Sequence, residues 1–177
     1  VKHFKAEIIV DVSERRAAES LALAGQEAVE VAETSGFRLI HITSEAGAKR
    51  LGKGTKWCTA WGDGDGRQNH FKDYKDNLLY LRSKHDGALY QLHFGDWMLH
   101  DAEDKPIKNF GQFMQQHDGL ARALTPFARP AIPTALTKAA EKGWVNRVVP
   151  LLTTCQSDPE WKKIATAAIP TALTKAA

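Results

Sequence analysis

Residues 78–101 read LLYLRSKHDGALYQLHFGDWMLHD, and the prediction of the fold begins from them. Asp86–Gly87 supplies the positive φ that a tight hairpin needs, and Gly95–Asp96 marks a second turn. Aromatic and aliphatic residues dominate the segments between these turns, which is typical of short β-strands. The expected strands of an antiparallel meander are residues 78–82, 88–94 and 97–101.

The middle strand alternates between two sets of side chains. Because successive residues of a strand point to opposite faces of the sheet, one set faces the core more than the other. Tyr90, Leu92 and Phe94 form the more apolar set, so their face is the better core candidate. The opposite set contains Leu89, Gln91 and His93.

The part of the chain before the meander predicts both helices and strands. Residues 14–33 are rich in Ala, Leu, Glu and Arg, which favour a helix, and Gly25 is expected to break or kink it. Glu14, Arg15, Arg16 and Glu19 are expected to form a solvated face of this helix. The other expected elements are strands at 4–12 and 37–42, a helix at 45–51 between a Thr43 or Ser44 cap and Gly52, a loop into a strand at 54–60, and a helical turn at 71–77.

The part after the meander predicts helices at residues 109–117 and 120–128. Pro126, Pro130 and Pro133 then follow in close succession, and proline inside a helix removes a hydrogen bond and clashes with the preceding turn. We therefore expect a domain boundary here. The fold class predicted is α+β: a small antiparallel meander with flanking helices over residues 1–128, followed by an α-helical segment over residues 129–177.

Ten residues of the helical segment occur twice. AIPTALTKAA at residues 131–140 returns at 168–177, a spacing of 37 residues. Repetition at such a spacing is typical of stacked helical units, each of which needs a neighbour to bury its apolar face. The pattern of Thr134, Ala139–Ala140, Gly143 and residues 148–152 resembles ankyrin repeats, although Thr137, Pro150 and the spacing depart from that family. The resemblance implies helical hairpins and protein–protein contact rather than catalysis.

Composition and charge exclude several classes of function. The chain has 24 basic and 21 acidic residues, and a net charge of +3 is too small to indicate nucleic-acid binding without a clustered patch. No apolar run approaches the ~20 residues of a membrane span, and no secretory signal pattern is present. Cys58 and Cys155 lie too far apart to suggest a disulfide, so we expect a cytoplasmic protein with no membrane partner. Four cations do cluster and leave a local anion site open: Lys49, Arg50, Lys53 and Lys56.

A second resemblance covers residues 39–107. GTKWCT at residues 54–59 precedes Phe71 and Tyr74, then Leu79–Tyr80, then YQLHF at 90–94 and DAEDKPI at 101–107. In this order the motifs resemble a family of uncharacterised proteins found in phages and prophages. The resemblance implies a phage-type fold and origin, and it implies no particular reaction.

The segment at residues 52–59 supports three interpretations. In the first, Trp57 and Cys58 are core residues, because free cysteine is among the most buried residue types. In the second, Cys58 is a nucleophile activated by a nearby cation, with His41, His70 or His93 as the base and Asp101 orienting it. In the third, backbone N–H groups and ammonium groups hold the phosphate of an anion or nucleotide. The residues of that anion site are Lys53, Gly54, Thr55, Lys56 and Trp57, with Trp61, Phe71 and Tyr74 nearby to stack a base.

The favoured hypothesis is a non-enzymatic module of phage or prophage origin that binds a host or defence protein. Its expected contact residues are Lys138, Lys142, Trp144 and Arg147. The alternative is an enzyme or nucleotide-binding domain that uses the Gly52–Cys58 loop, with a nucleotide or nucleic acid as partner. We expect no cofactor and no metal site, because Asp63 and Asp65 lack the rest of a calcium loop.

Overall fold

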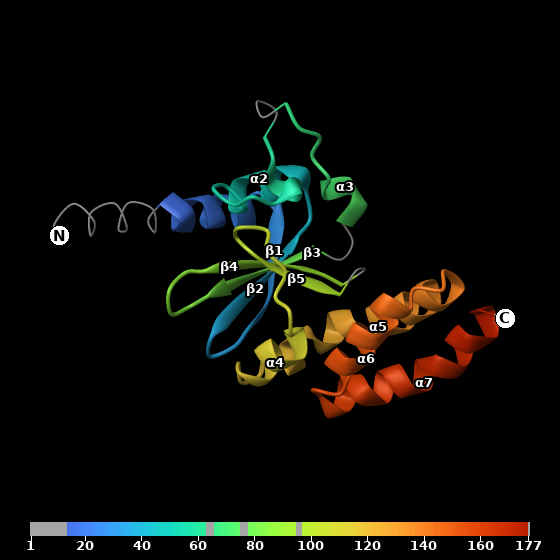
Figure 1. The fold of residues 1–177 in the computed structure, drawn as a ribbon. Coiled ribbons are helices and arrows are strands. Elements are labelled where there is room, and N and C mark those ends of the chain that lie inside the picture. Colours follow the sequence, from blue (N-terminus) through green and yellow to red (C-terminus); the bar gives the residue numbers. More distant parts are fainter. Residues whose placement is uncertain (1–13, 63–65, 75–77, 95–96, 177) are drawn as a thin grey trace.

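The computed structural model describes residues 14–62, 66–74, 78–94 and 97–176. It has an α+β fold, in which a five-stranded antiparallel sheet with strand order β1-β2-β3-β4-β5 is flanked by helices and followed by C-terminal helices. Figure 1 shows the sheet in the middle, with α2 and α3 on one side and α4 to α7 on the other.

The strands are β1 (Ala28–Glu33), β2 (Phe37–Ile42), β3 (Leu78–Ser83), β4 (Leu89–His93) and β5 (Met98–Asp101). The first group of helices is α2 (Glu45–Leu51), the short 3-10 helix η1 (Cys58–Ala60) and α3 (Phe71–Tyr74), and residues 14–24 are also helical. The second group is α4 (Phe110–Gln115), α5 (Leu120–Glu141), α6 (Val145–Cys155) and α7 (Pro159–Ala176).

The predicted meander is confirmed, with strand ends that differ from the expected ones by at most one residue. Tyr80 of β3 pairs with Gln91 of β4, which in turn pairs with His100 of β5. Gly87 has a φ of 72°, and the Asp86 carboxylate accepts a hydrogen bond from the N–H of Ala88, as a tight turn requires. The turn at residues 95–96 and the strand expected at 4–12 lie outside the described residues.

The helix expected over residues 14–33 is wrong in its second half. Helix ends at residue 24, Gly25 follows it, and residues 28–33 form β1 at the edge of the sheet. Pairing with β2 overrides the helical propensity of this segment, since Glu30 lies opposite Ile40 and forms an ion pair with Arg38. The predicted helix at 45–51 is confirmed: the Ser44 hydroxyl accepts a hydrogen bond from the N–H of Gly47, and Gly52 is the C-cap.

Both faces of the sheet are buried, so the prediction of a single core face was incomplete. The face with Leu92 and Phe94 packs against α4 to α7. The opposite face packs against Ala22, α2, Trp57 and Phe71. Consequently Leu89, Gln91 and His93, expected on the less buried face, are also buried.

Helix α5 is continuous over 22 residues, and the expected helix end at residue 128 is wrong. Pro126, Pro130 and Pro133 lie inside it, at a spacing that places all three on one helix face, where each is exposed or half-buried. Each proline leaves the carbonyl four residues before it without a helical hydrogen bond, and the residues that carry these carbonyls, Arg122, Pro126 and Arg129, are all exposed. The expected boundary between residues 128 and 129 therefore falls within a helix, and the division into two domains stays a prediction.

Helices α5 and α7 lie side by side and run in the same direction, with α6 returning between their ends (Figure 1). Gly143, with a φ of 64°, closes the end of α5 in the left-handed conformation. Thr134, part of the ankyrin-like pattern, lies inside α5 and donates a hydrogen bond to the carbonyl of Pro130 at 3.0 Å. None of the helices in the described ranges is long and apolar enough to cross a membrane.

Candidate functional site

The loop after α2 is held close to η1. Gly52 ends α2, and a Cβ atom at this position would lie 2.5 Å from the Cβ of Ala60. Gly54, with a φ of 85°, turns the chain in a conformation that residues with a side chain rarely adopt. These two glycines let the chain pass from the end of α2 to η1 while Lys53 projects outward, exposed to solvent.

The segment from Lys56 to Thr59 is anchored to the turn after β5. The indole N–H of the fully buried Trp57 donates a hydrogen bond to the backbone carbonyl of Asp101 at 2.6 Å. The backbone N–H of Lys56 donates to the carbonyl of Ala102 at 2.8 Å, and its ammonium forms an ion pair with Glu103 at 2.6 Å. Lys56 and Trp57 therefore fasten two loops together, and the strand expected at residues 54–60 is replaced by η1.

Thr59 ties η1 to the sheet through a buried polar network. Its hydroxyl donates a hydrogen bond to the side-chain oxygen of Gln91 and lies 3.4 Å from the hydroxyl of Tyr80. The Tyr80 hydroxyl also donates to the carbonyl of Ala48 in α2 at 3.4 Å. Because Thr59, Tyr80 and Gln91 are all buried, these bonds satisfy polar groups that water does not reach.

Cys58 lies at the start of η1 and is half-buried. Burial raises the pKa of its thiol, and the negative charge of Asp104 raises this pKa further. The thiol is therefore protonated at neutral pH, which is the opposite of what a nucleophilic cysteine needs.

The histidines near Cys58 have carboxylate partners of their own. His70 pairs with Asp73 at 2.9 Å, and His100 pairs with Asp104 at 2.8 Å; neither of these pairs includes Cys58. His93 is buried with its ring 4.1 Å from that of Tyr74. The second interpretation of the segment, in which Cys58 is a nucleophile with His41, His70 or His93 as its base and Asp101 orienting that base, gains no support from these contacts.

Asp101 shapes the turn that follows β5. Its carboxylate accepts hydrogen bonds from the N–H groups of Glu103 and Lys105, both at 2.9 Å. Within the described part of the chain, no group of three or more His, Cys, Asp or Glu side chains is arranged to hold a metal ion.

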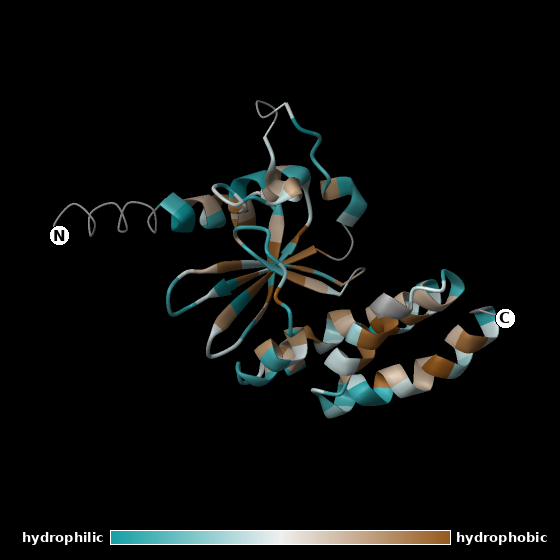
Figure 2. Cartoon of the chain, in the orientation of Figure 1, coloured by the Kyte–Doolittle hydropathy of each residue, from teal (hydrophilic) through white to brown (hydrophobic). Residues whose placement is uncertain are grey.

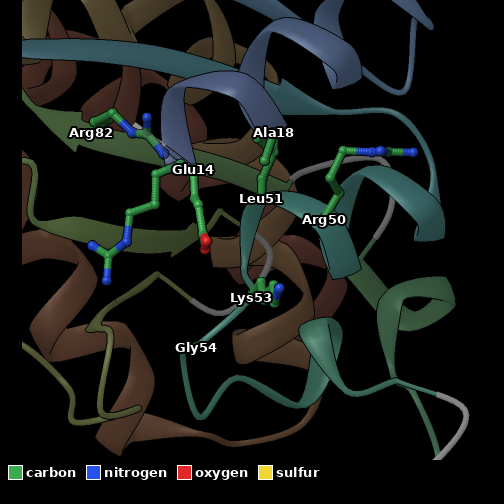
Figure 3. A pocket seen from close by; sticks show the side chains of 8 residues that line it. Glu14, Ala18, Arg50, Leu51, Lys53, Gly54 and Arg82 are labelled. Atoms are coloured by element: carbon green, nitrogen blue, oxygen red, sulfur yellow. The ribbon is translucent and has the colours of Figure 1, made fainter. Parts of the chain in front are cut away.

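A basic pocket lies between the N-terminal helix, the end of α2 and β3, with a volume of about 210 Å³. We name it the basic pocket, and it is lined by Glu14, Arg15, Ala18, Arg50, Leu51, Lys53, Gly54 and Arg82. Among the described residues, four basic residues and one acidic residue therefore contribute to the lining of a small cavity (Figure 3). Of the anion-site residues expected from the sequence, Lys53 and Gly54 line this pocket, whereas Thr55, Lys56 and Trp57 do not.

The charge on Arg82 is incompletely balanced. Arg82 and Arg38 both pair with the carboxylate of Glu19, which is buried although the sequence suggested a solvated helix face. Burial lowers the pKa of Arg82, and Arg15, Arg38 and Arg16 lower it further against the opposing effect of Glu19. The Nε atom of Arg82 is buried and makes no hydrogen bond to the described residues. An anion beside Arg82 would relieve this repulsion between cations.

The remaining charged residues of the pocket have distinct roles. Arg50 forms two hydrogen bonds with Glu27, at 2.8 and 3.2 Å, and its guanidinium points away from Lys53 in Figure 3. Glu14 and Lys53 both line the pocket. Glu14 therefore competes with any anion that enters the pocket, and Lys53 attracts one.

The aromatic residues expected to stack a base lie elsewhere. Trp57 and Phe71 are buried in the core. Trp61 packs against Arg67, with the guanidinium carbon 5.0 Å from the ring centre, and Tyr74 packs against His93. None of these four aromatic residues lines the basic pocket.

The expected partner-binding residues lie around the turn between α5 and α6. Lys138 and Lys142 are exposed, and Trp144 is half-buried at the start of α6. Arg147 belongs to α6, but its side chain lies outside the described residues. These residues border one end of the helical tail and do not approach the basic pocket's lining.

Sequence reasoning missed two cations of the basic pocket, Arg15 and Arg82. The cluster of Lys49, Arg50, Lys53 and Lys56 lies around the loop that contributes Arg50, Lys53 and Gly54 to this pocket. Arg15 lies on the N-terminal helix and Arg82 on β3, both distant from this loop in the sequence. Only the folded chain brings them next to the loop. A polar residue at the end of a predicted strand, such as Arg82 in β3, was the one signal available.

Comparisons with protein-family models, with curated protein sequences and with solved structures gave no match to this chain. The assignment of a function therefore depends on the geometry of the site.

Proposed function

We propose that this protein is a binding module that holds a phosphate group, or a comparable oxyanion, in the basic pocket. The observation that carries the proposal is that Arg15, Lys53 and Arg82 line one small cavity in which Glu14 is the one carboxylate among the described lining residues. Guanidinium and ammonium groups are the side chains that proteins use for phosphate recognition. The protonated Cys58 argues against a catalytic role for the neighbouring segment.

The size of the pocket supports a charged group rather than a whole molecule. A cavity of about 210 Å³ is smaller than the roughly 300–1,000 Å³ typical of pockets that enclose drug-sized ligands. Since no aromatic residue among those the structure describes lines it, we expect a nucleoside attached to the phosphate to extend outside. We therefore expect the phosphate end of a nucleotide to be recognised with little preference for the base.

The direct test is calorimetric titration with inorganic pyrophosphate and with ADP. In Lys53→Gln both ligands are expected to bind about three- to tenfold more weakly, because one attractive charge is lost. Glu14→Gln is expected to bind them more tightly by a similar factor, because a competing carboxylate is removed. Raising the salt concentration from 50 to 500 mM should weaken binding in every variant.

Lys56→Gln is the matched control, because Lys56 lies three residues from Lys53 but pairs with Glu103. It loses the same formal charge and should leave binding close to wild type. Equal weakening by Lys53→Gln and Lys56→Gln would indicate an unspecific effect of net charge and contradict the proposal, as would the absence of binding by either ligand.

The interaction hypothesis, a phage-derived module that contacts a host protein in the cytoplasm, is a separate proposal. It is supported by the exposed surface of the helical tail, and by the repeated decapeptide in α5 and α7. An ankyrin-like hairpin in the tail is supported by Gly143, which closes α5, and by the buried Ala139 near the turn. Within this hypothesis, the geometry gives most support to binding at the surface of α7.

A further inference from the structure

The decapeptide AIPTALTKAA occupies two different environments. In α5, Ile132 is fully buried and Leu136 is only 3% exposed. At the matching positions of α7, Ile169 is half-buried and Leu173 is 63% exposed. The two copies of the decapeptide therefore have the same sequence but different exposure: the copy in α5 is buried at these positions and the copy in α7 is largely open.

Helix α7 covers the first copy. The indole N–H of Trp161 donates a hydrogen bond to the hydroxyl of Thr125 at 3.0 Å, and Arg129 pairs with Glu160 at 2.6 Å. Further along, Pro133 and Thr137 of α5 line one groove together with residues of α7. The contact therefore follows a row of α5 residues spaced by about one helical turn, Thr125, Arg129, Pro133 and Thr137.

The same row exists on α7 and is open. A shift of 37 residues places Thr166, Pro170 and Thr174 where α5 has Arg129, Pro133 and Thr137. These three residues are exposed, and Leu173 lies beside them as Leu136 lies beside their counterparts in α5. We name Thr166, Ile169, Pro170, Leu173 and Thr174 the outer face of α7. Figure 2 shows hydrophobic residues on α7 close to the C-terminal end of the chain.

The row of α7 side chains that packs against α5 indicates what kind of helix would fit the outer face of α7. It consists of Trp161, Ala165, Ala168 and Ala172, all buried. Small alanine side chains let two helices approach closely, and a single aromatic residue fills the space at one end. The exposed Lys162 borders the outer face and favours an acidic residue in a bound helix.

We propose that the outer face of α7 binds an amphipathic helix of another protein, with an alanine-rich apolar stripe like that of α7. A second copy of this chain does not offer that stripe, because each copy already buries its own against α5. The bound helix lies parallel to α7, as α7 lies parallel to α5. This proposal is independent of the basic pocket, which lies on the other side of the sheet.

The test uses a fluorescent peptide with the sequence of residues 159–176, titrated with the full chain and followed by anisotropy. We expect saturable binding that is about tenfold weaker in Leu173→Ser. The matched control is Leu21→Ser, an exposed leucine (60%) on the N-terminal helix, which should leave binding unchanged. A peptide in which Ala168 is replaced by Glu should not bind, because its apolar stripe is interrupted.

Several results would overturn the proposal. Equal binding by wild type and Leu173→Ser would mean that the peptide displaces the chain's own α7 from α5 rather than adding to it. Equal losses in Leu173→Ser and Leu21→Ser would indicate unspecific hydrophobic contact. Failure of the peptide to bind, or self-association of the chain through Leu173 in sedimentation experiments, would also count against a separate helical partner.

Discussion

At the scale of single residues, the protonation of Cys58 separates a structural role from a chemical one. Burial, and secondarily the charge of Asp104, raises the pKa of this thiol above its usual range. A raised pKa means less thiolate at any given pH, so alkylation by iodoacetamide at pH 7.5 should be slower than that of free cysteine. Cys155, whose pKa burial raises to about 12, should not react until the protein unfolds. Mass spectrometry of the labelled chain measures both rates.

The pH dependence of that labelling gives the sign of the effect. The rate at Cys58 should rise with pH over a range that lies higher than that of free cysteine, because its thiolate forms at higher pH. Cys155 adds a stability term that is complete below pH 9 and is lost as the pH rises toward 12, because the unfolded thiol ionises first. Faster alkylation of Cys58 than of free cysteine at pH 7.5 would restore the nucleophile hypothesis.

Thr59 allows a second test at a single side chain. Thr59→Val keeps the shape of the residue but leaves the buried Gln91 oxygen without its donor. We expect the free energy of unfolding to fall by about 1–3 kcal/mol, measured by urea titration. Thr153→Val is the control, since this exposed hydroxyl only bonds the carbonyl of Val149 within its own helix, and its effect should stay below about 0.5 kcal/mol. Equal effects of the two variants would remove the structural role assigned to Thr59.

At the scale of elements, α5 contains prolines that cost stability. Pro130 is exposed inside the helix. Pro130→Ala should restore a backbone hydrogen bond and stabilise the protein by about 1–2 kcal/mol, after the gain in unfolded-state freedom is subtracted. Pro159→Ala should not stabilise it, because Pro159 is the first residue of α7, where no hydrogen bond is missing. Urea midpoints compare the two, and equal shifts would contradict this account.

The elements also show where local sequence signals suffice. The strands of the meander, the helix at 45–51 and the breaks at Gly25 and Gly143 followed from residues within the segments themselves. β1 could not be predicted, because pairing with β2 outweighs its helical composition. The continuation of α5 through three prolines could not be predicted either. The prolines share one exposed face of the helix, and that face is defined only when the helix is known to continue.

The candidate site shows the same limit at a longer range. Lys53 and Gly54 were predictable because they stand in one basic, glycine-containing loop. Arg82 was not, because β3 brings it to this loop only through the packing of the N-terminal helix on the sheet. The motif around Trp57 and Cys58 was conspicuous in sequence because it holds two loops and the sheet together, not because it lines the pocket.

At the scale of the whole molecule, the sheet carries a separate core on each face. The core that contains Leu92 and Phe94 continues without interruption into α5, α6 and α7. Trp161 of α7 lies at 6.3 Å from Phe94 and 5.5 Å from Trp97, measured between ring centres. The helical tail is thus the cover of one face of the sheet rather than an appendage to it.

Removal of residues 129–177 should therefore abolish the native packing of the α+β part. It would cut α5 near its middle and expose Leu92, Phe94 and their neighbours to water. We expect the lost free energy of apolar burial to exceed the total stability of a typical domain, which is about 5–15 kcal/mol. We expect the fragment to lose near-ultraviolet circular dichroism and to bind a hydrophobic dye. A second fragment, ending at residue 167, keeps Trp161 and should retain cooperative unfolding at reduced stability, because only Ala168 and Ala172 leave the core. Cooperative unfolding of the 1–128 fragment with native near-ultraviolet dichroism would instead establish the two-domain division, and α5 would then be a connection between two independent units.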